Sequence, residues 1–554
     1  MQLSAFFRRA WPVFLLAMCA LYFYGLNRVP FIGPDEPRYA EVGREMWLRG
    51  DPVSPTLGNH LWFEKPALLY WMMIASFRLF GVSEWAARFG PACSGIITVL
   101  AVLWIGSRVE DARGGSREET GGLGLCCGAA LASSLGMMVF ARGASFDVIV
   151  TMTITVALAC FFVSETDVGK KERRWLLALF YVFTGASLLA KGLIGIVIPY
   201  TVVFVYFALR RAWPERQILL SFLWGTMLAV VVAALWYAPV TARHGWYFID
   251  QFFIQHHFAR FLSNKYHHPQ PFYFYAPVLA ALVVPWTLFL ASALMAALRS
   301  NWRAPDAASK FRLFALAWLV VPVIFFSASN SKLPGYILPA VPGAALLIGK
   351  RLARYLRGGN SGSRDVGSVL LMRATGALLL LLAAASVIAV AQSEYLTRET
   401  ALIVILPLIV AGVTALFWAR RRELCAVLLV CAMFGTMALA IDYASEGMTR
   451  RESVRSLLER AAQEGYAAAP VFQLHTIERS AEFYAAGRLS YDANGEPTKF
   501  ESVTQVLAAA RQSGSTALVI VPLPYVSQLT TYAPLETRVI GDNGDLALVA
   551  ARVR

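Results

Sequence analysis

The chain has little charge for its length. Only 15% of its 554 residues are Asp, Glu, Lys or Arg, whereas soluble domains average about 25%. Hydrophobic residues make up 57% of the chain, and the mean hydropathy is +0.55. This composition argues against a soluble globular protein and predicts a polytopic membrane protein.

Cysteine is also scarce, and its placement argues against redox or zinc chemistry. All seven cysteines lie inside apolar stretches, and none has metal-ligand spacing, so we interpret them as small apolar fillers; they are Cys19, Cys93, Cys126, Cys127, Cys160, Cys425 and Cys431. The chain also lacks an internal repeat, a nucleotide-binding glycine pattern and low-complexity segments.

The net charge of +15 does not indicate nucleic acid, because the basic residues are spread in a particular way. They recur in short clusters between apolar runs, as at Lys170 to Arg174, Arg210-Arg211 and Arg420 to Arg422. Such spacing is typical of the cytoplasmic loops of membrane proteins, with some attraction to anionic head groups. We therefore expect a bilayer as partner and no nucleic acid.

Apolar runs long enough to cross a bilayer predict about thirteen transmembrane helices. The expected spans are 10–28, 87–107, 122–140, 146–164, 174–190, 192–209, 217–240, 273–297, 312–328, 335–350, 368–391, 400–418 and 424–441. The first run lacks a small-residue cleavage site, so we interpret it as a retained anchor. Every second loop is basic, which predicts a cytoplasmic N-terminus and an outer C-terminus.

One apolar run, Ala67 to Phe80, is too short to span and suits an interfacial helix. Residues 30–86 then form a large outer loop with two surface helices. The first of them, roughly 36–49, is amphipathic: Tyr39 and Met46 share one side, and the charged residues face the other.

The composition becomes polar after the last span. Residues 443–554 are predicted to form a small α/β domain, with strands at 470–474 and 517–521, helices at 452–464 and 503–512, and a hairpin around 541–544. The predicted division is a transmembrane domain at 1–442, which includes a second outer loop at 241–272, and this outer domain.

Unusual polar residues gather on the predicted outer face. Asp35, Arg38, Glu64 and Lys65 lie in the first outer loop, and five of the seven histidines lie in the loop 241–272. The remainder flank outer turns between spans; they are Arg142, Asp147, Lys191, Lys332 and Tyr336. Charge held against a bilayer is costly and usually functional. Converging carboxylates, cations and imidazoles predict a pocket for an anionic amphiphile such as a lipid phosphate.

Each of these residues also has a structural interpretation. Asp35 could cap the helix at 36–49, and Glu64-Lys65 could mark the head-group boundary. A histidine-rich loop is more often polar than metal-binding when it lacks tight zinc spacing. Structural causes would scatter such residues over both faces of the membrane, however, and here they gather on one.

Several strings resemble the lipid A aminoarabinose transferases, bacterial members of the dolichyl-phosphate-mannose protein mannosyltransferase superfamily. The resemblance covers about residues 10–350. It rests on Pro34-Asp35-Glu36-x-Arg38-Tyr39-Ala40-Glu41, Phe63-Glu64-Lys65-Pro66, Ala190-Lys191-Gly192, His257-x-x-Arg260-Phe261, His268-x-x-Pro271-Phe272-Tyr273 and Lys332-Leu333-Pro334-x-Tyr336.

The resemblance implies an all-α transmembrane fold of the GT-C type and a glycosyltransferase activity. The enzyme would move 4-amino-4-deoxy-L-arabinose from its undecaprenyl phosphate carrier to a lipid A phosphate at the bacterial inner membrane, with inversion. The implied consequence is resistance to polymyxin and other cationic antimicrobial peptides.

Roles for the residues follow from that chemistry. We expect Asp35, Lys65 and Asp147 to be catalytic. Lys65, with Arg38, would stabilise the departing lipid phosphate, and Asp35 would orient a substrate, hold the sugar ammonium or share a metal. Substrate binding is expected of Arg38, Glu64, Arg142, Lys191, Arg260, Lys332 and Tyr336. No cofactor is certain; a divalent metal on Glu64, His257 and His268 is one hypothesis. A phosphate acceptor is already ionised near neutral pH, so Asp35 need not act as a base.

Two other functions compete with this interpretation. A related polyprenyl-phosphate-sugar glycosyltransferase would modify a protein or glycan hydroxyl instead. A lipid transporter or flippase would place its ionisable residues near the bilayer midplane and often shows repeated halves. The charges here gather at one surface and no repeat is visible, which disfavours transport.

Overall fold

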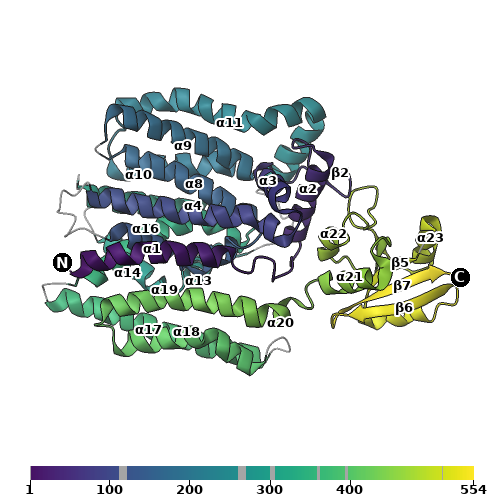
Figure 1. Cartoon of the computed structure of the whole chain (residues 1–554). Coiled ribbons are helices and arrows are strands. Elements are labelled where there is room, and N and C mark those ends of the chain that lie inside the picture. Colours follow the sequence, from purple (N-terminus) through teal and green to yellow (C-terminus); the bar gives the residue numbers. More distant parts are fainter. Residues whose placement is uncertain are drawn as a thin grey trace. The chain divides into compact units, whose positions relative to one another are not determined.

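The computed structural model describes residues 2–111, 122–166, 168–259, 270–299, 306–358, 362–392, 397–514 and 516–554. Contacts divide the chain into two compact units (Figure 1). We call Met1–Tyr24, Glu64–Leu69 and Phe89–Ala440 the helical unit, and Gly25–Phe63, Tyr70–Arg88 and Ile441–Arg554 the mixed unit. Each is described by itself below.

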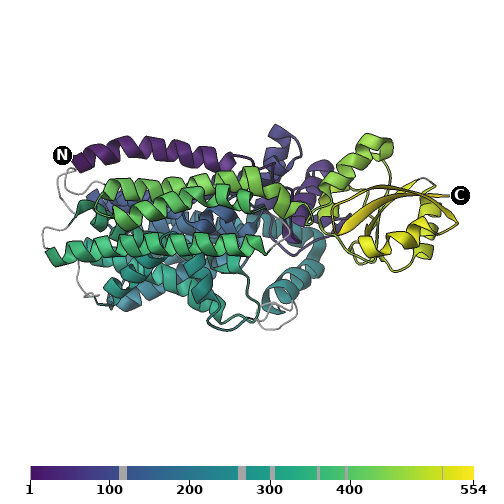
Figure 2. The ribbon, with the colours of Figure 1, turned by 90° about the horizontal axis from the view of Figure 1, so that it is seen from below.

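Long helices that lie side by side make up the helical unit, and the two views in Figures 1 and 2 agree on this arrangement. Its helices are α1 (Gln2–Phe23), α4 (Glu84–Asp111, from Phe89 on), α6 (Leu123–Ala132), α7 (Leu135–Phe140), α8 (Phe146–Ser164), α9 (Lys170–Lys191), α10 (Ile194–Arg210), α11 (Arg216–Ile249), η1 (Asp250–Ala259), α13 (Tyr275–Leu282), α14 (Thr287–Leu298), α15 (Ala307–Ser327), η2 (Pro334–Ala340), α16 (Val341–Arg357), α17 (Gly362–Ala391), α18 (Arg398–Phe417) and α19 (Arg422–Leu439).

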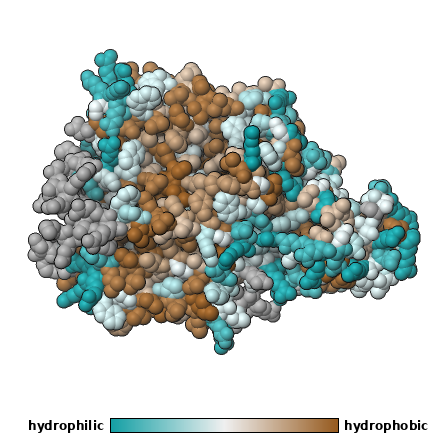
Figure 3. Space-filling model, in the orientation of Figure 1, coloured by the Kyte–Doolittle hydropathy of each residue, from teal (hydrophilic) through white to brown (hydrophobic). Residues whose placement is uncertain are grey.

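The helices confirm a multi-pass membrane protein. Within the described residues, nine helices are long and apolar enough to cross a bilayer, and the pair α13 and α14, bent by 117°, adds a tenth. Figure 3 shows apolar side chains over much of the visible face of this unit, as expected of a surface that contacts lipid.

The count of thirteen spans is not confirmed. All thirteen expected positions are helical, but three of them fall on apolar helices shorter than a full span: the described part of α1 (Ala10–Phe23), α6 and α10. The expected span 122–140 is broken because Ser133 and Ser134 separate α6 from α7. Hydropathy averaged over a window does not detect such a break.

The mixed unit contains a five-stranded sheet in the order β4-β3-β5-β7-β6. β3 (Val471–Leu474) pairs in parallel with β4 (Lys499–Phe500) and β5 (Ala517–Pro522), whereas β7 (Leu546–Val553) pairs antiparallel with β5 and β6 (Leu535–Asp542). The predicted strands and the hairpin near 541–544 are therefore present.

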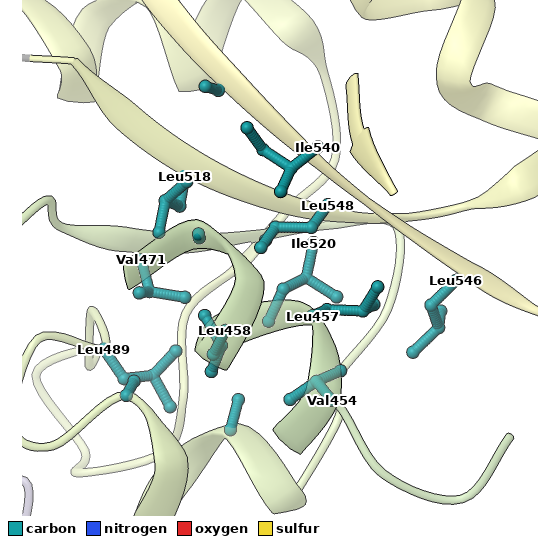
Figure 4. Close-up of a cluster of buried hydrophobic side chains, with 14 residues drawn as sticks. Val454, Leu457, Leu458, Val471, Leu489, Leu518, Ile520, Ile540, Leu546 and Leu548 are labelled. Carbon is teal, nitrogen blue, oxygen red and sulfur yellow. The ribbon is translucent and has the colours of Figure 1, made fainter. Parts of the chain in front are cut away.

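Alternate residues of β5 lie in two different hydrophobic clusters, as the two-residue period of a strand requires. Leu518 and Ile520 belong to the cluster drawn in Figure 4, with Val454, Leu457 and Leu458 from the segment around α21 (Arg455–Ala461). Val519 and Val521 belong to a second cluster with α23 (Val503–Ser513). Helices therefore cover both faces of the sheet.

The remaining helices of the C-terminal segment, residues 440–554, are short. They are η3 (Ala440–Ala444), α20 (Ser445–Thr449), η4 (Ala462–Tyr466), α22 (Ser480–Tyr484), η5 (Leu523–Tyr525) and α24 (Val526–Thr530).

The predicted outer loop contains both expected helices, α2 (Asp35–Arg49) and α3 (Leu68–Phe80). Between them β1 (Thr56–Leu57) and β2 (His60–Leu61) form a hairpin. Its turn residues Gly58 and Asn59 have φ of 58° and 66°, the left-handed geometry that a two-residue hairpin turn requires.

The division of the chain differs from the expected one at this loop. The boundary at Ala440 lies close to the predicted one at 442, but 25–63 and 70–88 group with the C-terminal segment. The reason is that α2 packs against α22, a helix more than 400 residues further along the chain. A sequence pattern does not reveal a contact at that separation.

Candidate functional site

Three of the predicted site residues meet in the helical unit. Asp147 lies in the first turn of α8, where the Ser145 hydroxyl accepts a hydrogen bond from its backbone N–H at 3.1 Å. Its carboxylate forms an ion pair with Lys191, the last residue of α9. The Lys191 Nζ atom also lies 4.5 Å from the ring centroid of Tyr336 in η2. One cation thus joins three elements distant in sequence.

Gly335 allows this approach because it has no side chain. A Cβ atom at this position would lie 2.3 Å from Asp147 Oδ2 and 2.7 Å from Phe140 Cε1. Any larger residue would therefore displace the carboxylate. The glycine of the Lys-Leu-Pro-Gly-Tyr string has a structural reason for its place.

Arg142 and Lys332 bind backbone carbonyls. Arg142 donates to the carbonyl oxygens of Leu21 and Tyr24, each at 2.5 Å, at the C-terminal end of α1. Lys332 is 6% exposed and donates from Nζ to the carbonyls of Ser329 at 2.6 Å and Gln270 at 2.9 Å. These contacts give both residues a structural role, and substrate binding by them stays a prediction.

Glu64 and Lys65 form an ion pair with each other, with 2.8 Å between Lys65 Nζ and Glu64 Oε1. Their side chains are only 10% and 14% exposed, so the pair is largely shielded from water. Within this pair the charge of Lys65 is balanced by Glu64.

In the mixed unit, two adjacent carboxylates have opposite surroundings. Glu36 binds Arg88 through both oxygens, at 3.2 Å from Nε and 2.6 Å from Nη2, and Arg88 is 3% exposed. Asp35 is exposed, and among the described residues its carboxylate has neither a hydrogen bond nor an ion pair. Pro34 occupies the N-cap of α2 without a side-chain hydrogen bond, so Asp35 does not act as the helix cap.

Arg38 lies between an aromatic ring and a carboxylate. Its guanidinium carbon is 5.0 Å from the Trp62 ring centroid, and its Nε is 3.7 Å from Glu482 Oε2. The Glu482 side chain is fully buried and accepts a hydrogen bond from Arg479 at 2.7 Å. Burial raises the pKa of Glu482 above its ordinary value. The positive charges of Arg38 and Arg479 partly offset this rise.

Glu41 is the most strongly perturbed carboxyl of α2. It is 2% exposed, Arg44 Nη2 donates a hydrogen bond to its Oε1 at 2.6 Å, and the same nitrogen lies 2.5 Å from its Oε2. Burial raises the pKa of Glu41 to about 8, although Arg44 opposes the rise. Arg44 also donates to the carbonyl of Phe483 at 2.9 Å.

The side chains of three predicted site residues are not described by the structure. Arg260 and His268 lie outside the described residues, and His257 is described only as part of the backbone of η1. Across the described parts of the chain, no group of three His, Cys, Asp or Glu side chains is placed to hold a metal ion. The metal hypothesis on Glu64, His257 and His268 stays a prediction.

The structure adds residues that the sequence did not single out. Arg88, Glu482 and Tyr484 contact the segment that contains Asp35, and Arg479 pairs with Glu482. Only Arg479 and Glu482 had a local signal, because their i,i+3 spacing suits an ion pair on one helical turn. The expected meeting of Asp35, Lys65, Asp147 and Lys332 around one cavity involves both units and stays a prediction.

Known proteins resemble this chain over a large part of its length. An arabinosyl transferase from Pseudomonas aeruginosa (strain UCBPP-PA14), named undecaprenyl phosphate-alpha-4-amino-4-deoxy-L-arabinose arabinosyl transferase, is 32% identical over 358 residues, or 64% of this chain and 61% of that protein. A protein of the same name from Aeromonas salmonicida is 31% identical over 63% of this chain and 60% of its own length. The chain thus matches about three fifths of the length of these curated relatives.

The fold is also similar to a solved structure along nearly the whole chain. The crystal structure of ArnT from Cupriavidus metallidurans bound to undecaprenyl phosphate aligns with a TM-score of 0.78 at 23% identity, covering 98% of both chains. Residues 9–299, more than half of the chain, match the family described as dolichyl-phosphate-mannose-protein mannosyltransferase. The chain therefore belongs to the dolichyl-phosphate-mannose-protein mannosyltransferase family.

Proposed function

We propose that this protein is an inner-membrane glycosyltransferase that moves 4-amino-4-deoxy-L-arabinose from undecaprenyl phosphate to a phosphate of lipid A. The observation that carries the proposal is the 32% identity, over 358 residues, to a relative named for the aminoarabinose donor. The donor is a polyprenyl-phosphate sugar, the acceptor is lipid A, and the result is resistance to polymyxin.

The chemistry that we propose is a direct displacement with inversion. An oxygen of the lipid A phosphate attacks the anomeric carbon of the sugar, and the bond from that carbon to the carrier phosphate breaks with its electron pair leaving on undecaprenyl phosphate. The acceptor is ionised near neutral pH, because the second pKa of a phosphate is about 6. No general base is therefore needed, and the task of the protein is to stabilise the negative charge that develops on the leaving group.

The residues divide these tasks according to their surroundings. Lys65, shielded beside Glu64, stabilises the phosphate charge together with Arg38, Lys332 and Tyr336. The Asp147–Lys191 pair holds the phosphate or the amino sugar, which offers a group of each sign. Asp35, exposed and without a partner among the described residues, binds the sugar ammonium or orients the acceptor.

An apolar groove beside Lys191 suits the prenyl chain of the donor. It measures about 640 Å³ and is lined by Leu188 and Leu193, which flank Lys191 in the chain, and by Val230, Tyr237 and Phe253. A long hydrocarbon chain gains free energy by leaving water for such a surface. Lys191, which lies between Leu188 and Leu193 in the chain, would then meet the phosphate at the end of that chain.

We further propose thirteen spans, a cytoplasmic N-terminus and an outer, periplasmic C-terminal segment. This arrangement would put Asp35, Lys65, Asp147, Lys191 and Lys332 on the periplasmic face, where both lipids are available in the outer leaflet. The alternation of basic loops supports it.

The test is transfer by the purified full-length protein. It would be incubated with labelled undecaprenyl-phosphate aminoarabinose and either lipid A, a protein acceptor or a glycan acceptor, with and without chelator, and the product identified by mass spectrometry. We expect label on lipid A alone. Label on the protein or glycan would instead support the related glycosyltransferase, and loss of activity with chelator would support the metal hypothesis.

A further inference from the structure

The short helix α22 contacts the segment around Asp35 at several places. On the N-terminal side, the hydroxyl of Tyr484 accepts a hydrogen bond from the backbone N–H of Phe31 at 2.8 Å. The Phe31 ring packs edge-on against Phe483, with 4.8 Å between the ring centroids. Phe31 lies four residues before Asp35 and is fully buried.

On the C-terminal side, α22 binds two arginines of α2. Buried Glu482 faces Arg38 at 3.7 Å, and the Phe483 carbonyl accepts a hydrogen bond from Arg44 at 2.9 Å. Arg38 follows Asp35 by one helical turn. The segment Phe31–Arg38 is therefore held at both ends by one helix of the C-terminal segment.

A second anchor fixes α22 itself. Tyr484 donates from its hydroxyl to Glu84 Oε1 at 3.0 Å, and Ser480 Oγ accepts from the Val454 N–H at 3.0 Å. Ala481 and Ala485 belong to the hydrophobic cluster on one face of the sheet. The helix thus links the packed sheet to the segment that contains Asp35.

Among the described residues, the side chain of Asp35 has no restraint of its own. It is exposed, and its carboxylate has no partner within the described part of the chain, so only the backbone on either side fixes its position. Catalytic groups lose much of their effect when displaced by about 1 Å.

We infer that the C-terminal segment serves catalysis by positioning Asp35, with Glu482 and Tyr484 as the positioning residues. This inference rests on the proposed transferase function for its catalytic consequence, but the restraint on Phe31–Arg38 is measurable without any substrate. The C-terminal segment would thus hold in place the N-terminal end of α2, where Asp35 lies.

The test combines amide hydrogen exchange with kinetics on the purified full-length protein. In Tyr484→Phe, the Phe31 amide loses its acceptor, and exchange across Phe31–Arg38 should accelerate about tenfold. Glu482→Gln should accelerate exchange in α2 from Tyr39 on, where the amides have intrahelical acceptors. For both variants we expect kcat to fall about tenfold while KM for the donor lipid changes less than about twofold.

Val519→Ala is the matched control. Val519 lies in the cluster with α23, whereas α22 packs on the other cluster, so this variant weakens the sheet without touching the contacts to Phe31 or Arg38. It should accelerate exchange in the sheet and leave kcat and the Phe31 amide as in the natural protein.

Unchanged exchange and unchanged kcat in both positioning variants would overturn the inference, as would a change confined to KM. An equal loss of kcat in Val519→Ala would also overturn it, because general destabilisation would then explain the effect. If the natural protein transfers no aminoarabinose, the proposed function fails, and the restraint on Phe31–Arg38 is decided by the exchange data alone.

Discussion

Two adjacent carboxylates of α2 have separate tasks. Glu36 neutralises Arg88, whose guanidinium is buried and also donates to the carbonyls of Leu26 and Val29. Asp35 makes no such contact among the described residues, and its charge is therefore available to a substrate.

This contrast predicts that Asp35→Asn abolishes transfer without unfolding the protein. We expect kcat/KM to fall at least about a hundredfold, a loss typical of removing one charged transition-state contact, while the melting temperature stays within about 2 °C. Glu36→Gln should do the opposite, lowering stability by about 1–3 kcal/mol because Arg88 loses its counter-charge. Near-normal transfer by Asp35→Asn would refute its catalytic role.

The Asp147–Lys191 pair predicts non-additive variants. Asp147→Asn and Lys191→Gln should each lower kcat/KM about tenfold to a hundredfold, because each leaves the other charge without its partner in a shielded site. Since the two side chains act together, the double variant should lose little more than either single one. Steady-state kinetics on the three variants measure the coupling, and fully additive losses would show that the two residues act separately.

Periodicity predicts α2 but not its surroundings. The pattern that puts Tyr39 and Met46 on one side indicates a helix over 36–49, and the structure has it at Asp35–Arg49. The charged side is buried as well, with Glu41 at 2% and Arg44 at 8% exposed, because α22 packs against it. A sequence shows which residues share a helix face, but it does not show what covers a face from more than 400 residues away.

The same limit explains which site residues could be predicted. Asp147, Lys191 and Tyr336 were predicted from short strings at the ends of spans, and the structure brings these three together. Glu482 and Tyr484 stand in a segment with no recognisable string, and their importance follows only from three-dimensional packing.

Burial of Glu41 predicts a pH-dependent stability of the mixed unit. Its pKa rises from the ordinary 4.5 to about 8, so the folded state keeps a proton that the unfolded chain releases. The contribution of the protonated Glu41 carboxyl to the free energy of unfolding is fully present below pH 4.5. It is lost as the pH rises through about 8. The change is on the order of a few kcal/mol.

Thermal unfolding of the purified protein between pH 5 and 8.5 measures this effect. We expect the melting temperature to fall as the pH rises, and Glu41→Gln should flatten that dependence because Gln does not titrate. Glu501→Gln, at an exposed carboxyl whose pKa Lys499 lowers, is the control and should leave the slope unchanged. A natural protein with no slope in this range would contradict the prediction.

At the scale of the whole molecule, the number of spans decides on which side of the membrane the two ends lie. Thirteen spans place the termini on opposite sides, whereas ten, the largest number that passes by length and composition among the described helices, would place them on the same side. The three helices in question are α1, α6 and α10, whose apolar parts are between 10 and 17 residues long. Packing against neighbours allows a short apolar helix to cross a bilayer with local thinning.

Reporter fusions in a bacterial host distinguish these arrangements. We expect alkaline phosphatase, which is active only outside the cytoplasm, to be active when fused after Arg554 and inactive when fused within the basic segment Lys170 to Arg174 at the start of α9. A fluorescent protein that matures only in the cytoplasm should give the reverse pattern. If the fusion after Arg554 were cytoplasmic while the N-terminus is cytoplasmic too, the number of spans would be even, and the C-terminal segment would lie on the wrong side of the membrane to position Asp35 for periplasmic chemistry.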